Sequence, residues 1–418
     1  MPLDLNFQIQ LFKEFLNNGG ISSINHEDLL KSLISIEFDR NGNVKPETVN
    51  SLVRATLNAY TGSQLLGPYI SESFLSYYET KLQKSLFFDI TTIETYDKFI
   101  EIFESYSQKK NILYRGINEA KYRLYSSLQR YWITNKLSAK NIEYKNFVEL
   151  LIFNASENGE IRKKLDGTVV TDLSILSILQ HYLTPTPLLD WTYSLTTSLL
   201  FAINGLCQKF GKRRDIENYF SIYHIPEENF RGANLKFILE KGLMGNLPLI
   251  RSTIIENYKL TGDDLIRFNE SMTDERLIKI AKKSYGPGIQ IDLSMIDKLF
   301  GFEVLYFGDY EQPQDFNFGL NNNPNILEQM GVFTFNNNPT KPIEHMVNIN
   351  NVENGIIKSP IQLCYCWDIN KNISDRISKF LINNGFEYDA LFPEPSNSFM
   401  INISKDIFKT TISQLIKI

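Results

Sequence analysis

The chain has 418 residues, of which 43% are hydrophobic, and this is enough for one large globular domain with a smaller one beside it. Its 43 Lys and Arg residues are outnumbered by 48 Asp and Glu residues. The formal net charge of -5 gives no overall attraction to nucleic acid or to an anionic membrane, so any basic site must be local.

Three cysteines, Cys207, Cys364 and Cys366, are too few for a disulfide framework. Cys364 and Cys366 share one face of a predicted strand, which argues against a metal cluster. The N-terminus lacks a basic segment followed by an apolar core, and the most apolar later stretch, 195–207, is too short to cross a bilayer. We therefore expect a cytoplasmic protein that holds no metal and does not enter a membrane.

Residues 1–92 predict helices joined by polar turns. The amphipathic stretch FQIQLFKEFL is followed by Asn-Asn-Gly-Gly at 17–20, which is typical of a helix end. Pro46 stands where a first helical turn tolerates proline. Since no strand-like alternation persists here, we expect an N-terminal helical region.

From residue 93 to 418 the pattern mixes strands with helices. A largely helical insertion is predicted at about 227–298, where apolar residues recur at helical spacing. Strands are predicted at 112–116, 219–225, 302–308, 331–335, 361–369 and 399–404. We expect an α+β fold in which a mixed or antiparallel β core is flanked by helices, and the pattern leaves the strand order open.

The predicted strand at 112–116, ILYRG, ends in a charged residue. Arginine presents a planar fork suited to bidentate binding of an oxyanion, and the glycine at 116 removes a side chain from the approach. One interpretation is that Arg115 pairs structurally with an acidic residue such as Asp190. The other is that Arg115 and Gly116 form the rim of a cleft and face a phosphate or carboxylate ligand.

The segment 174–205 has the strongest pattern in the chain. Apolar residues at 175, 178, 179, 182 and 183 fall on one face of a helix, while Gln180 and His181 lie off that face. Pro185 and Pro187 disfavour helical geometry in the residues before them, so the helix must end there. The following LLDW is expected to run directly into a second amphipathic helix.

Each polar residue of this segment has two interpretations. Asp190 or Thr192 stands where a helix cap is expected, a role that contributes about 1 kcal/mol, and His181 fits a helical histidine satisfied by a backbone carbonyl. Alternatively, the tight corner between the helices holds Gln180, His181, Asp190 and Thr192 near one another as a ligand site. The sequence leaves both interpretations open.

Six motifs follow one another in a familiar order: YRG at 114–116, LYSSLQR at 124–130, QHYLTPTPLLDWT at 180–192, SLLFA at 198–202, EQMGVF at 328–333 and ALFPEP at 390–395. Over about 93–405 the chain thereby resembles the FRG domain family. Leu183 stands where that family usually has glycine, which predicts a less tightly turned helix end. Pro187 stands where it usually has arginine, which removes one candidate guanidinium for binding phosphate.

The aromatic-Arg-Gly strand end is also similar to the first motif of the arginine class of ADP-ribosyltransferases, although the Ser-Thr-Ser strand of that class is not evident. This resemblance implies an ADP-ribosyltransferase-like fold and an enzyme that uses NAD to modify a macromolecular target, as in a bacterial or phage toxin or phage-defence system. Glu328 is the first choice for the carboxylate and Glu394 the second. The implied catalytic residues are Arg115, Glu328, Gln329, His181 and Asp190, and the implied cofactor contacts are Arg115, Gly116, Tyr182 and Thr192.

Two other functions are open. A non-catalytic module of a defence system, which senses or binds a nucleotide in the same cleft, would use Arg115 and His181 equally well and needs no carboxylate. A nuclease would use His181 and Asp190 for acid–base work, but the sequence has no dense acidic cluster at metal-ligand spacing. The expected partners are a protein or nucleic-acid target and a cognate antitoxin or regulatory protein.

Overall fold

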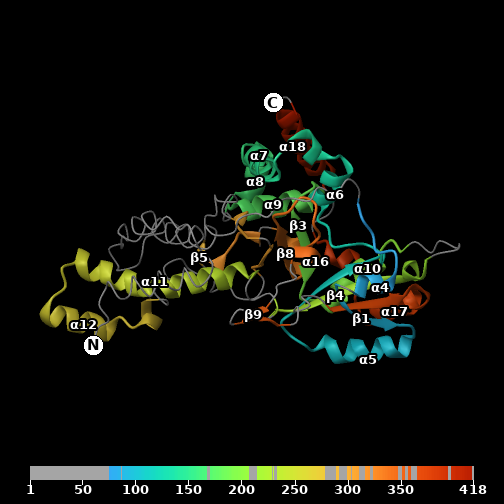
Figure 1. Ribbon diagram of the computed structural model, residues 1–418, viewed down its shortest axis with the longest axis horizontal. Coiled ribbons are helices and arrows are strands. Elements are labelled where there is room, and N and C mark those ends of the chain that lie inside the picture. Colours follow the sequence, from blue (N-terminus) through green and yellow to red (C-terminus); the bar gives the residue numbers. More distant parts are fainter. Residues whose placement is uncertain are drawn as a thin grey trace.

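The computed structural model describes residues 75–416, apart from 86, 167–169, 207–213, 228, 230–232, 278–288, 291–298, 303, 310–315, 321–322, 347–350, 354–355, 359–364 and 394–396. This part of the chain has the predicted α+β fold, in which helices surround a mixed seven-stranded sheet (Figure 1). The predicted helices before residue 75 lie outside the described residues.

The central sheet has the strand order β1-β11-β4-β2-β3-β8-β6. β1 and β11 are parallel, and the other neighbouring strands are antiparallel. Its strands are β1 (Asp89–Ile93), β2 (Ile112–Ile117), β3 (Leu188–Thr192), β4 (Tyr219–Pro226), β6 (Val304–Phe307), β8 (Gly331–Asn336) and β11 (Tyr365–Asn370). The short pairs β5 (Ile289–Gln290) with β7 (Phe316–Asn317) and β9 (Asn351–Glu353) with β10 (Ile356–Lys358) form two further sheets.

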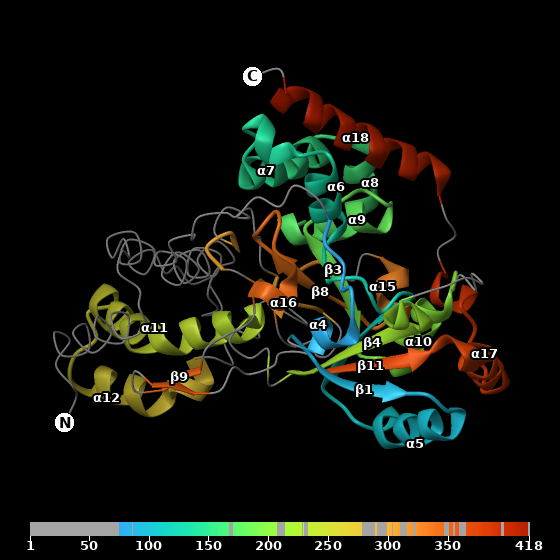
Figure 2. The ribbon, with the colours of Figure 1, turned by 45° about the vertical axis from the view of Figure 1, so that its right-hand side comes forward.

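The helices gather in three places around this sheet. The first layer packs on one face of β1, β11, β4 and β2 and contains α5 (Tyr96–Ser107), α10 (Leu195–Ile203) and α17 (Ser374–Asn383). The second group lies beyond β3 and contains α6 (Ser127–Thr134), α7 (Tyr144–Ser156), α8 (Gly159–Leu165), α9 (Asp172–His181) and α18 (Ser398–Ile416) (Figure 2). α11 (Leu235–Asn257) and α12 (Gly262–Ser271) extend away from the sheet, within the predicted insertion at 227–298 (Figure 1).

The remaining helices are short. They are α4 (Lys81–Ser85), α15 (Pro324–Glu328), α16 (Ile343–Met346) and the 3-10 turns Leu137–Lys140, Asp215–Asn218, Lys371–Ile373 and Asp389–Leu391. Within the described ranges, no helix combines the length and the apolar character needed to cross a membrane.

Most of the predicted strands are confirmed, and three predictions are wrong. The strands at 112–116, 219–225, 302–308 and 331–335 are present, as is the described part of the one at 361–369. The stretch 399–404 belongs to α18 and is not a strand, because its buried residues Met400, Ser404, Ile407 and Thr411 recur at helical spacing. LLDWT forms β3 before α10 begins, and β1 is an unexpected strand within residues expected to be helical.

A buried ion pair ties α4 to the sheet. Lys84 is fully buried, and its Nζ donates to Oδ1 of Asp368 at 2.6 Å and to Oγ of Ser221 at 2.8 Å. Asp368 lies on β11 and Ser221 on β4. The described residues before 93 are therefore linked to the α+β core by side-chain contacts as well as by the continuous backbone. β1 also runs across the boundary at 92/93 that the sequence predicts.

The sheet is incompletely paired between β2 and β3. β2 pairs with β4 through six residue pairs, from Ile112↔Pro226 to Ile117↔Ser221, but it pairs with β3 only at Tyr114↔Thr192. Residues 115–117 of β2 therefore lack strand partners on the β3 side. The sheet opens at the end of β2 that carries Arg115.

Gly116 is required by the close approach of α10 to β2. A Cβ built on Gly116 would lie 1.8 Å from the backbone oxygen of Ser198 and 2.9 Å from Cβ of Ala202. Both contacts are to α10, and neither the backbone nor an alanine Cβ can move aside as a flexible side chain does. The glycine therefore lets the helix lie against the strand that carries Arg115.

We expect Gly116→Ala to lower the free energy of unfolding by about 3 kcal/mol, because the added methyl group must push α10 away from β2. Denaturant-induced unfolding measures this change. Gly159→Ala is the matched control, since a Cβ there meets nothing within 4 Å. If both substitutions have equal effects, the packing of α10 against Gly116 is not what requires the glycine.

Helix α9 ends in a tight turn although it has leucine where the family usually has glycine. Leu183 has a φ of 61°, its N–H donates to the oxygen of Gln180 at 3.1 Å, and the N–H of Thr184 donates to the oxygen of Leu179 at 2.9 Å. These two bonds define a Schellman motif with Leu183 at its left-handed position. The expectation of a looser helix end is wrong, because the leucine adopts the conformation that glycine favours.

We expect Leu183→Gly to raise the free energy of unfolding by about 0.5–1 kcal/mol, since relief of the left-handed strain outweighs the greater entropy of glycine in the unfolded chain. Leu183 is 67% exposed, so little buried contact is lost. Leu183→Ala keeps the Cβ and should give no such gain in the same unfolding experiment. A gain from alanine as large as that from glycine would show that the turn is not strained.

Candidate functional site

A cavity of about 830 Å³ lies where β2 and β3 separate. Most of its wall comes from β2, the chain after it, α6, α9, β3 and the start of β8, and residues 75–77, α10, α15 and Phe392 complete it. Among the described residues that line it, the charged side chains are those of Arg115, Arg123, Arg130 and Asp190. With three guanidinium groups and one carboxylate, the cavity is cationic although the whole chain is acidic.

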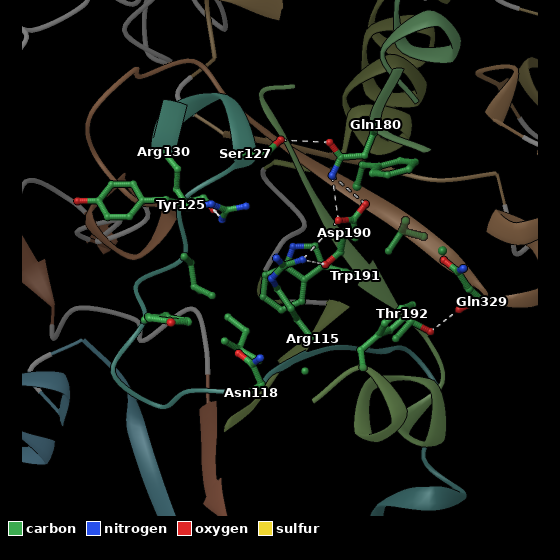
Figure 3. Close-up of a pocket in the computed structure, with 18 of the residues that line it drawn as sticks. Arg115, Asn118, Tyr125, Ser127, Arg130, Gln180, Asp190, Trp191, Thr192 and Gln329 are labelled. Atoms are coloured by element: carbon green, nitrogen blue, oxygen red, sulfur yellow. Dashed lines mark hydrogen bonds and ion pairs between the residues drawn. The ribbon is translucent and has the colours of Figure 1, made fainter. Parts of the chain in front are cut away.

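Arg115 bridges the gap between β2 and β3. Its Nη1 donates to the backbone oxygen of Asp190 and lies 3.7 Å from the carboxylate Oδ2 of the same residue (Figure 3). Burial lowers the pKa of Arg115 and the Asp190 charge opposes this effect, but a guanidinium stays protonated at neutral pH. The Nε atom is buried and has no hydrogen-bond partner among the described residues. Arg115 therefore pairs with Asp190, as the structural interpretation predicts, and it also lines a cavity, which leaves the ligand-binding interpretation open.

Gln180 holds the Asp190 carboxylate from the other side. Its Nε2 donates to Oδ2 of Asp190 at 2.9 Å and to Oδ1 at 3.2 Å, while its Oε1 accepts from Oγ of Ser127 at 3.4 Å (Figure 3). Asp190 is therefore fixed in position, although its side chain is 54% exposed. The predicted cap is elsewhere, because Ser194 accepts from the N–H of Thr197 at 3.1 Å and begins α10.

Arg130 supplies a second guanidinium that the sequence analysis assigned no role. Its Nη1 donates to the backbone oxygen of Tyr125 at 2.7 Å, and its side chain faces the same space as Arg115 and Asp190 (Figure 3). Burial lowers the pKa of Arg130, and the negative charge of Asp190 again opposes this. Pro187, which stands where the resembled family usually has arginine, is buried and does not line the cavity, and Arg130 supplies a second guanidinium there.

A local signal for Arg130 was present in the sequence. Ser126 and Gln129 form a capping box that starts α6, and this fixes Arg130 on the first turn of the helix. Arg123 also lines the cavity, with its guanidinium 4.6 Å from the ring centre of Tyr78. No motif pointed to Arg123, because its position depends on how the chain folds back after β2.

Four other predicted residues line the cavity. The Nε2 of His181 lies 3.4 Å from Nδ2 of Asn325. Thr192 donates to the backbone oxygen of Gln329 at 2.6 Å, and Nε2 of Gln329 donates to the oxygen of Leu391 at 3.0 Å. Gly116 lines the cavity too, but α10 already requires it to be glycine.

Two other predicted residues, Tyr182 and Glu328, do not line it. Tyr182 is 2% exposed and belongs to the hydrophobic core beside α9, so its ring cannot stack on a ligand in the cavity. Glu328 is exposed at the end of α15 and is absent from the lining. Glu394 lies outside the described residues.

Further lining residues had not been singled out in the sequence. Ser177 and Thr184 contribute buried hydroxyl groups from α9 and the turn after it. Tyr77 and Tyr122 are exposed at the cavity, with ring centres 5.6 Å apart. The described residues contain no group of three or more His, Cys, Asp or Glu side chains that would hold a metal ion.

Comparison with known proteins agrees with one of the two resemblances. No curated protein and no solved structure matches the chain. Residues 110–209 match the FRG domain, whereas the motifs at 328–333 and 390–395 lie outside the matched range. The matched range supplies all four charged side chains of the cavity and the α9 wall. The chain therefore contains an FRG domain, and the cavity is built largely from it.

Proposed function

We propose that the FRG domain binds a nucleotide in this cavity, with the phosphate groups held by Arg115 and Arg130. The observation that carries this proposal is the presence of three arginines and one aspartate in the lining. Arg123 lies near the buried carboxylate of Glu344, whereas Arg115 and Arg130 share the single carboxylate of Asp190, so an anionic ligand meets a net positive wall at Arg115 and Arg130. Guanidinium groups bind phosphate oxygens through paired N–H donors.

The dimensions and the mouth of the cavity also suit a nucleotide. A volume of about 830 Å³ lies within the range of small-molecule and cofactor sites. Tyr77 and Tyr122 offer exposed aromatic rings beside the arginines, and such rings stack on bases. NAD, the cofactor implied by the resemblance to ADP-ribosyltransferases, combines these features and is the first ligand to test.

We expect calorimetry to detect binding of ADP and NAD and to show that Arg115→Lys weakens it by about 10- to 100-fold, because lysine keeps the charge but loses the bidentate fork. Arg130→Met should weaken binding to a similar degree. Arg162→Met is the matched control, since Arg162 pairs with Glu157 on the surface and does not line the cavity. Equal affinity of wild type and both cavity variants would contradict the proposed phosphate site.

A second candidate function, ADP-ribosyl transfer from NAD, is favoured by the Asp190 carboxylate. It is the one carboxylate in the described lining, and Gln180 holds it in place. In this reaction the bond between C1′ of the ribose and the nicotinamide nitrogen breaks, and nicotinamide leaves with the electron pair. A nucleophile of the acceptor then bonds to C1′ and releases its proton, while a carboxylate stabilises the oxocarbenium-like charge. The acceptor would be a protein or nucleic acid in a toxin or phage-defence system, controlled by a cognate antitoxin.

For this candidate we expect nicotinamide release from NAD to fall by about 100-fold or more in Asp190→Asn, because the amide removes the stabilising charge. Glu328→Gln should release nicotinamide at the wild-type rate, since Glu328 is exposed outside the cavity. Chromatography of the released nicotinamide measures both. If the wild type binds NAD without releasing nicotinamide, the domain is a binding or sensing module and the transferase function fails.

A further inference from the structure

One face of α9 forms a polar stripe, defined by Ser177, Gln180, His181 and Thr184, along the cavity. The spacing i, i+3, i+4 places Ser177, Gln180 and His181 on one side of the helix, and Thr184 follows in the turn after α9, where its N–H donates to the oxygen of Leu179 at 2.9 Å. All four line the cavity, while the residues on the other sides of α9 are buried in the hydrophobic core. The stripe is therefore a polar wall on an otherwise apolar helix.

Two members of the stripe are already engaged by the protein. Gln180 donates to Asp190 at 2.9 Å and accepts from Ser127, and His181 lies 3.4 Å from the amide of Asn325. The hydroxyls of Ser177 and Thr184, by contrast, have no hydrogen-bond partner among the described residues. Their residues are only 1% and 2% exposed, so open solvent does not satisfy them either.

Several buried helical hydroxyls of the described residues are paired, although Ser404 on α18, away from the cavity, also has no partner. In the same protein, Ser198 donates to the oxygen of Leu195 at 2.7 Å, and Thr411 donates to the oxygen of Ile407 at 2.9 Å. Helical serine and threonine commonly satisfy themselves in this way. Ser177 does not, and a buried hydroxyl without a partner is costly. Ser177 and Thr184 are residues of the cavity wall, so rotation about the Cα–Cβ bond that turns either hydroxyl into the cavity would let a bound group supply the missing hydrogen bond.

The stripe also has a fixed relation to the arginines. Gln180 contacts Asp190, which contacts Arg115, so the middle of the stripe adjoins the proposed phosphate site. Ser177 lies about one helical turn before Gln180, and Thr184 lies in the left-handed turn that ends α9. The stripe carries no arginine, lysine or carboxylate, so it suits an uncharged hydrogen-bonding group rather than a second phosphate.

We infer that the ligand has two chemically distinct parts: an anionic part at Arg115 and Arg130, and an uncharged part that donates and accepts hydrogen bonds along the α9 stripe at Ser177 and Thr184. This inference rests on the proposed function and names the class of ligand more closely. Sugar hydroxyls and base amides both have this chemistry. A phosphate attached to an apolar chain does not, because it would leave both hydroxyls buried and unpaired.

The test compares pyrophosphate, ribose 5-phosphate and ADP by calorimetry on the wild type and on the double variant Ser177→Ala, Thr184→Val. Because neither hydroxyl has a partner within the described protein, the double variant should unfold at or above the wild-type temperature. We expect it to bind pyrophosphate as the wild type does and to bind ADP about 5- to 50-fold more weakly. Equal weakening of ribose 5-phosphate and ADP assigns the stripe to the sugar, and weakening of ADP alone assigns it to the base.

Thr411→Val is the control, because Thr411 is a buried helical threonine that does not line the cavity. It should leave the affinity for ADP unchanged. If ADP binds and depends on Arg115 but the double variant binds it as tightly as the wild type, the inference is overturned while the proposed function stands. If neither pyrophosphate nor ADP binds the wild type, the proposed function itself fails and the inference fails with it.

Discussion

The guanidinium of Arg115 closes a sheet that backbone pairing leaves open. β2 and β3 share one residue pair, and beyond it the backbone oxygen of Asp190 accepts from a side chain of the neighbouring strand. A backbone carbonyl inside a sheet needs a donor, and here the donor carries a positive charge. The same contact therefore joins the two strands, leaves space between them and places a cation on the wall of that space.

Regular elements surround this contact and hold it rigid. Gly116 lets α10 approach β2 closely, and the left-handed turn at Leu183 sets the direction in which the chain leaves α9 for β3. Gln180, from the last turn of α9, reaches the carboxylate that Arg115 approaches from the opposite side. Helices and strands therefore position Arg115, Gln180 and Asp190, although part of the cavity wall comes from the chain between β2 and α6.

The sequence predicted the α+β class and most strands, because alternating or continuous apolar runs such as 219–225 and 331–335 are strong local signals. Strand prediction failed where the local apolar pattern is weak or conflicts with the pattern of a longer segment. β1 is a mostly exposed edge strand with little apolar pattern, and 399–404 alternates over six residues inside a 19-residue helix. The sequence motifs identified five residues that line one cavity: Arg115, His181, Asp190, Thr192 and Gln329. They also pointed to Tyr182 and Glu328, which do not line it, because tertiary packing decides which side chains face the cavity. Arg123 and Ser177 could not be identified from the sequence either, because their position in the cavity wall depends on the tertiary fold.

The strand order also determines which fragment of this chain can fold independently. β2 makes its longest pairing with β4, and β3 pairs along its whole length with β8, yet both partners lie after residue 209. A fragment cut to 110–209 would therefore expose the backbone edges of two strands and lose the sheet that supports them. β1 pairs with β11, more than 270 residues later, so the sheet can be completed only after β11 has been synthesised. The recognisable unit of sequence is smaller than the cooperative unit of folding.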